Sequence, residues 1–232
     1  FAVSSTAGSL GGIVDVDALH LYLNRGLPAD SAIQHHKAYV RNIAYSLQYI
    51  DHLLGELEHS ELQRTLHSQT CKSVVVVGMG VVEAILWYLL CTSGGARTRK
   101  WEELKKLTAP SFVQAGETLR IVNVVERELA QAELEEMTLD AMVKRAEKRL
   151  LLGSLDHAVY GHLRVLRQLR NRVHIHAVQH DADTDWFSFT GREVKLLLDA
   201  LRSILSLEFF QPTPDRLAFL SFMDSNRVER RS

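Results

Sequence analysis

The stretch "VVVVGMGVVEAILWYLLC", residues 74–91, is an almost unbroken apolar run. It is about long enough to cross a membrane. Glu83 stands at its centre, however, and a lone carboxylate in lipid is costly. We therefore predict a buried core helix rather than a membrane span. A helix that is apolar on nearly all sides is typical of the centre of a bundle. We interpret Gly78 and Gly80 as positions of close helix packing, because no strand-then-loop context supports a dinucleotide loop.

Helical spacing continues on both sides of this run. Residues 31–58 repeat apolar positions every three to four residues, as Ile43, Leu47 and Ile50 illustrate. Residues 138–152 are also helical in pattern, and Thr190 with Glu193 forms a capping box ahead of the last helix. The long helices are expected at about residues 31–58, 61–92, 154–176 and 191–210. Four long helices with short connections predict a mostly α protein built as a bundle.

An insertion is expected between the second and third long helices, at about residues 95–137. Within it, "WEELKKL" (101–107) predicts a short helix. Residues 118–132 begin with β-branched, partly alternating positions, which favour a strand or hairpin. The domain division predicted from sequence is an N-terminal extension (1–30), a helical domain (31–210) and a C-terminal tail (211–232).

Composition narrows the class of protein. Apolar residues make up 46% and charged residues 24%, as in ordinary globular proteins. The net charge of −1 gives no global basic field, so any nucleic-acid contact must come from a local patch. Cys71 and Cys91 are the only cysteines, which fits a reducing, cytoplasmic location. No metal-ligand spacing is present, and we predict neither a metal nor a cofactor.

The segment "RVLRQLRNRVHIHAVQH", residues 164–180, is dense in arginine and histidine. On a helix, Arg167, Arg170 and His174 fall on one stripe. A neighbouring apolar stripe, which includes Leu166 and Leu169, is expected to dock into the bundle. The arginine stripe is then either the charged border of a bundle helix or a functional face.

Part of this segment, "LRQLRNRVHIH" (166–176), resembles the signature of HEPN-domain proteins. In that signature an arginine, often followed by a polar residue, precedes a histidine by four to six residues. Arg170 and Asn171 match the arginine and its polar follower, and five residues separate Arg170 from His176. Six residues separate Arg167 from His174, which also shares a helix face with Arg170, so both histidines remain candidates. The resemblance covers about residues 31–210.

The resemblance also extends to the apolar helix, where Glu83 would be a buried carboxylate opposite the arginine helix. It implies a HEPN-like helical bundle acting as a homodimer, with the two Arg/His motifs meeting at the interface. Many such proteins are metal-independent endoribonucleases of toxin–antitoxin or anti-phage defence systems. Arg170 would hold the phosphate, and His174 or His176 would move the proton. Asn171 and Arg167 would support them.

The partners implied are an RNA substrate, a second copy of the chain and an antitoxin or other defence protein, with no membrane. Two alternatives remain open. The chain could be a non-catalytic HEPN-like module that binds a protein or nucleotide. It could also be a structural subunit of a larger defence complex, in which the arginine stripe meets another chain. A shared fold does not decide among these functions.

Overall fold

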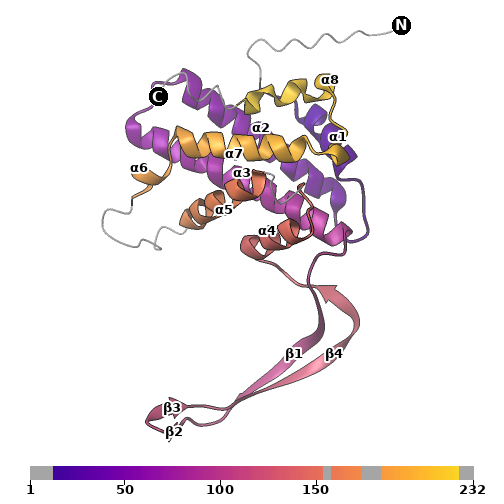
Figure 1. The fold of residues 1–232 in the computed structure, drawn as a ribbon, viewed down its shortest axis with the longest axis vertical. Coiled ribbons are helices and arrows are strands. Elements are labelled where there is room, and N and C mark those ends of the chain that lie inside the picture. Colours follow the sequence, from indigo (N-terminus) through magenta and orange to yellow (C-terminus); the bar gives the residue numbers. More distant parts are fainter. Residues whose placement is uncertain (1–12, 154–157, 174–183, 225–232) are drawn as a thin grey trace. The chain divides into compact units, whose positions relative to one another are not determined.

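The computed structural model describes residues 13–153, 158–173 and 184–224 of the 232-residue chain, and they are mostly helical (Figure 1). The chain divides into two compact units. The helical unit comprises Phe1–Gly95 and Leu139–Ser232, and the hairpin unit comprises Ala96–Thr138. The mostly α fold expected from the sequence is confirmed, with small antiparallel sheets confined to the hairpin unit among the described residues.

The helical unit is organised around one long apolar helix. Its helices are α1 (Val16–Gly26), α2 (His36–His59), α3 (Arg64–Thr92), α4 (Leu139–Lys148), α5 (Val159–Arg170), α6 (Asp185–Ser188), α7 (Gly191–Leu205) and α8 (Pro214–Leu217). Short 3-10 turns follow at Asn171–Val173, Glu208–Phe210 and Ala218–Met223. Helix α3 contacts α2, α4, α5, α6 and α7, and Figure 1 shows α2, α3 and α7 running alongside one another.

Helix α3 has the burial expected of a core helix. By length and composition it could cross a membrane, but 61% of its most apolar window is buried inside the protein. Gly78 explains how closely a neighbour approaches, because a Cβ added there would lie 2.3 Å from Cδ2 of Leu197 in α7. A Cβ at Gly80 would meet nothing within 4 Å. The first glycine therefore serves packing, and the second lies on the open side of the helix.

The predicted extension (1–30) and tail (211–232) both contain core residues, so those two boundaries are corrected. In α1, Leu19 and Leu23 are fully buried, and the Tyr22 hydroxyl donates to the Leu205 carbonyl. The Tyr22 ring also stacks on Phe210, with ring centres 5.5 Å apart. The segment 218–223 buries Leu220, Phe222 and Met223. Periodicity is hard to read in such short helices, which offer too few turns to display it.

The hairpin unit is a long hairpin closed by a shorter one. Strand β1 (Thr98–Thr108) pairs antiparallel with β4 (Val122–Leu134), and β2 (Phe112–Gln114) pairs with β3 (Glu117–Leu119). Ala115 and Gly116 turn the tip with φ of 53° and 83°, as a tight hairpin requires. The unit spans 96–138, against the insertion expected at 95–137.

One element inside the insertion was predicted wrongly. The sequence "WEELKKL" carries helix formers at helical spacing, but it lies in strand β1. Its partner is β4, whose Val122, Val124 and Val125 lie directly opposite Thr108, Lys106 and Lys105. Strand preference depends on cross-strand neighbours more than on local propensity, and these neighbours lie many residues away in the sequence.

Candidate functional site

Helix α5 positions the arginines predicted to be functional. It packs against α3, α4 and α7. Leu163 and Leu166 are fully buried on its apolar face, and Tyr160 is also buried. The helix ends at Arg170, and a 3-10 turn begins at Asn171. The arginine side chains therefore project beside a face that is fixed by the core, as the sequence predicted.

Arg170 is bound to the carboxylate in the middle of α3. Its Nη2 donates to Oε2 of Glu83 over 3.2 Å. The two side chains are 34% and 31% exposed, so the carboxylate expected to be buried is only half-buried. A guanidinium has five N–H donors, and this contact engages one of its nitrogens. The geometry fixes the guanidinium and leaves donors for an anion.

A neutral tyrosine lies near this pair. The hydroxyl of Tyr39 in α2 donates to the carbonyl of Ala84, the residue after Glu83. Burial raises the pKa of Tyr39 well above its ordinary value, and the nearby Cys91 and Glu83 raise it further. Tyr39 is thus a hydrogen-bond donor that fixes α2 against α3, not an acid or base at neutral pH.

The two preceding arginines are bound to helix α4. Arg167 forms an ion pair with Asp140, and Arg164 forms one with Glu147. Arg167 is 27% exposed, whereas Arg164 is 58% exposed. Along this stripe, each arginine from 164 to 170 is therefore matched by a carboxylate of the same chain.

A further cationic cluster surrounds Asp185 in the short helix α6. Lys72 of α3 approaches Asp185 at 2.7 Å, and Nε of Arg172 lies 4.0 Å from the other carboxylate oxygen. The Lys72 ammonium also lies 5.6 Å from the centre of the Phe189 ring. These contacts join α6 to α3 and to the turn after α5. They were not predicted, because Asp185 stands in a stretch that reads as a loop.

The remaining predicted residues are Asn171, His174 and His176. Asn171 is exposed at the end of α5, where its N–H donates to the carbonyls of Arg167 and Leu169. His174 and His176 lie outside the described residues. The structure thus brings Arg170 and Glu83 together and places Arg167 one turn away.

Asp140 and Glu147 are the site residues that sequence reasoning missed. They stand seven positions apart, which is two helical turns, so they share one face of α4. The helices expected from sequence at 138–152 and 154–176 have a short connection and should run antiparallel, which would set Asp140 near Arg167 and Glu147 near Arg164. The seven-residue spacing of Asp140 and Glu147 is therefore the sequence feature that could have predicted these two ion pairs.

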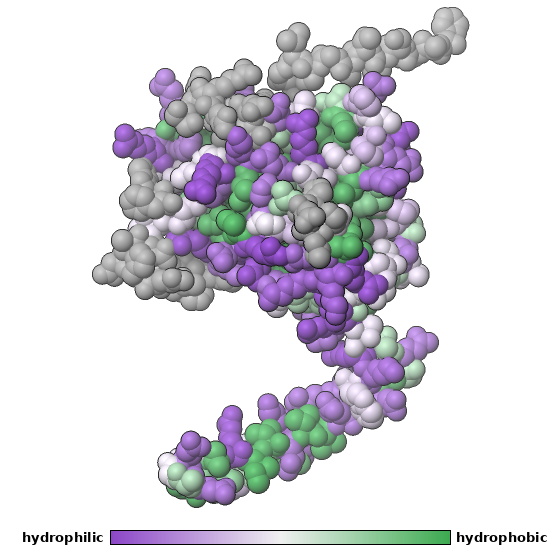
Figure 2. Space-filling view, in the orientation of Figure 1, coloured by the Kyte–Doolittle hydropathy of each residue, from purple (hydrophilic) through white to green (hydrophobic). Residues whose placement is uncertain are grey.

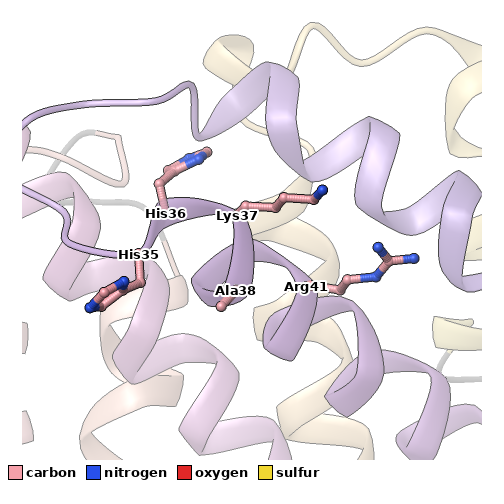
Figure 3. A pocket seen from close by; sticks show the side chains of 5 residues that line it. All are labelled: His35, His36, Lys37, Ala38 and Arg41. Carbon is pink, nitrogen blue, oxygen red and sulfur yellow. The ribbon is translucent and has the colours of Figure 1, made fainter.

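An open surface hollow of about 560 Å³ lies at the start of α2. Its lining is mostly cationic or imidazole-bearing: His35, His36, Lys37, Ala38 and Arg41. Figure 3 shows Lys37 and Arg41 extending in the same direction, with His35 pointing away from them. Arg41 is paired with Asp17 at 3.1 Å, and His36 Nε2 donates to the Leu27 carbonyl at 2.6 Å. These side chains serve the contact between α1 and α2, and we assign the hollow no ligand.

Within residues 13–153, 158–173 and 184–224, no three His, Cys, Asp or Glu side chains come together as metal ligands. Comparison with known proteins does not assign a function to the site. No family model, no curated protein and no solved structure matches this chain. The assignment of function therefore depends on the motif and on the geometry around Arg170.

Proposed function

We propose that this chain is a HEPN-like, metal-independent endoribonuclease of toxin or defence type, acting as a cytoplasmic homodimer. The observation that carries the proposal is the Arg170–Glu83 pair. It holds an arginine in a half-buried setting directly before Asn171 and the two candidate histidines. The free, buried thiols of Cys71 and Cys91 fit a reducing compartment.

The chemistry requires a phosphate clamp and a proton carrier. The 2′-hydroxyl of RNA attacks the adjacent phosphorus while His174 or His176 accepts its proton. The bond from phosphorus to the 5′-oxygen breaks, and a second histidine protonates that oxygen. The products are a 2′,3′-cyclic phosphate and a 5′-hydroxyl end. Arg170 binds the phosphate oxygens and offsets the charge of the transition state.

A homodimer supplies the second histidine, since each copy brings one motif to a two-fold interface. Arg167 and Asn171 support the site by ordering the end of α5. Any other protein partner, such as an antitoxin, would act on the same face. This reaction uses no metal and no cofactor.

The test is RNA cleavage in excess EDTA by the purified full-length chain. Arg170→Ala, His174→Ala and His176→Ala are compared with the unmodified chain on a mixed RNA pool. We expect cyclic-phosphate ends and a loss of about 100-fold or more in Arg170→Ala and in one histidine variant. The histidine whose loss abolishes cleavage is the proton carrier.

Arg164→Gln is the matched control, because Arg164 also pairs with a carboxylate but is more exposed and lies outside the motif. It should cleave RNA like the unmodified chain. All variants must have matching circular dichroism and melting temperature. No cleavage by a folded dimer, or equal activity in Arg170→Ala, would contradict the ribonuclease proposal.

A second candidate function is a non-catalytic HEPN-like binding module or a structural subunit of a defence complex. It is favoured by the pairing of Arg164, Arg167 and Arg170 with carboxylates of the same chain. Arginines held in this way can serve the fold alone. An inactive chain that remains folded, and that loses a copurifying protein when Arg167 or Arg170 is changed, would support this candidate.

A further inference from the structure

The hairpin unit keeps large apolar side chains in contact with solvent. Along β1 and β4 they are 42–56% exposed: Trp101, Leu104, Leu107, Val124, Val125 and Leu134. Figure 2 shows the resulting apolar areas on the surface of this unit. Contiguous exposed apolar surface marks contact sites for other molecules.

Strand β1 has a neighbour on one side only, because its sheet consists of β1 and β4 alone among the described strands. The second edge of such a strand presents N–H and C=O groups that can pair with another strand. Protein partners that add a strand use this kind of edge. The edge of β1 is therefore a place where a further strand can bind.

When two copies of β1 are placed antiparallel, acidic side chains of one copy face basic side chains of the other. Read antiparallel about Leu104, Glu103 meets Lys105, and Glu102, which already pairs with Arg127 of β4, meets Lys106. Opposite charges at facing positions stabilise strand pairs, and like charges destabilise them. Turning the strand about Trp101 would set Glu103 against Arg99, which already pairs with Glu133, and would leave Lys105 facing Arg97, beyond the start of β1. The register centred on Leu104 instead joins Glu103 to Lys105.

The existing register leaves the central charges of β1 without opposite partners. Glu103 lies opposite Glu126, and Lys105 lies opposite Val125. Leu104, between them, is skipped by the pairing and is 56% exposed. Among the described residues, neither Glu103 nor Lys105 forms an ion pair. A second β1 strand would supply both with partners.

We propose that β1 pairs antiparallel with β1 of a second copy of this chain, about a two-fold axis at Leu104. The product is a four-stranded sheet in the order β4–β1–β1–β4. Trp101 of each copy then faces Leu107 of the other. Acidic and basic side chains nearly balance in residues 96–138, so the hairpin unit offers RNA no basic surface. This contact uses β1, whereas the proposed ribonuclease dimer uses α5, so a chain that makes both contacts should form assemblies larger than a dimer.

Charge reversal tests the pairing. In a homodimer, Glu103→Lys sets lysine against Lys105 twice, and Lys105→Glu sets glutamate against Glu103 twice. Each variant should weaken self-association by about tenfold or more, measured by sedimentation velocity over a concentration series. Mixing the two variants restores every opposite-charge pair, so the mixture should associate like the unmodified chain. The double variant Glu103→Lys/Lys105→Glu should do so alone.

Three results of these association measurements would contradict the β1–β1 pairing. An unmodified chain that stays monomeric would overturn the proposal, and the bulge at Leu104 would then protect the edge, as bulges commonly do. A dimer held through α5 would survive both reversals, so the association step that depends on β1 is the one compared; if no association step weakens in either variant, the proposal is overturned as well. A mixture no more associated than its components would exclude this register. RNA cleavage by the double variant reports separately on the proposed function.

A thiol placed on the axis gives a second, independent measurement. Leu104→Cys should form a disulfide-linked dimer under mild oxidation, because an axial residue faces its own copy. Cys71 and Cys91 are buried and do not compete. Val113→Cys is the control, since this residue is 72% exposed but lies in β2. Faster linkage through Trp101→Cys than through Leu104→Cys would overturn the axis at Leu104.

Discussion

The helical unit has a buried core, whereas no residue of the hairpin unit is buried. In the helical unit, Leu86 and Leu197 are fully buried, and Arg170 is bound to Glu83. In the hairpin unit, Leu104 is 56% exposed and Glu103 faces another glutamate. The first unit packs most of its apolar side chains into a core, although Leu21 and Leu66 are exposed. The second has no core of its own, and the proposed strand pairing would cover part of its exposed apolar surface.

The largest expected effect comes from the same substitution made in each unit. Leu86→Ala removes a fully buried side chain from α3 and should lower the free energy of unfolding by about 2–5 kcal/mol. Leu104→Ala removes an exposed side chain and should change it by less than about 0.5 kcal/mol at low protein concentration. Urea denaturation measures both. Equal losses would mean that the hairpin unit has its own core.

The next largest expected change in stability comes from alanine substitutions on the packed and the open side of α3. Gly78→Ala drives a methyl group into Leu197 and should cost about 1–3 kcal/mol. Gly80→Ala meets open space and should gain about 0.5–1 kcal/mol from the better helix propensity of alanine. Thermal melts of the two variants make the comparison. Stabilisation by both substitutions would contradict the close approach of α3 and α7.

A smaller change in stability should distinguish the half-buried ion pair of Arg170 from the more exposed ion pair of Arg164. Glu83→Gln weakens a half-buried contact to Arg170 and should cost about 1 kcal/mol. Glu147→Gln weakens a contact to the mostly exposed Arg164 and should cost less than about 0.5 kcal/mol. Urea denaturation at physiological salt measures the loss of unfolding free energy in both variants. The reverse order would mean that α4, not α3, fixes the end of α5.

The smallest effect is confined to alkaline pH. Burial raises the pKa of Cys71 from 9.0 to about 12 and that of Cys91 from 9.0 to about 11. Between pH 9 and 11 the unfolded chain loses thiol protons that the folded chain keeps, so stability falls as pH rises through that window. At pH 8 both thiols should resist Ellman's reagent, whereas Leu104→Cys should react at once. Rapid native labelling of either thiol would contradict their burial.

Local patterns were the most predictable part of this fold. The capping box of Thr190 and Glu193 is confirmed, because both partners lie within one turn of sequence. Helix α3 was expected at 61–92 and spans Arg64–Thr92 for the same reason, since its apolar run is continuous. Strand β1 was missed because its stability depends on β4, which the local sequence does not display.

The site was predictable only in part. The encounter of Arg170 with Glu83 joins positions 87 residues apart, and the resemblance rather than any spacing pointed to it. Asp140 stands on α4, which ten residues separate from α5, and nothing in the sequence around this aspartate identifies Arg167 as its partner. The two candidate histidines remain a prediction from the motif.

The most direct test of the contrast between the units is hydrogen–deuterium exchange of the intact chain at two protein concentrations. The account predicts that amides in α3 exchange slowly and equally at both concentrations. Amides in β1 should exchange more slowly at the higher concentration, because the second copy occupies the open edge. Exchange in β1 that is independent of concentration, or that is as slow as in α3 throughout, would contradict the account.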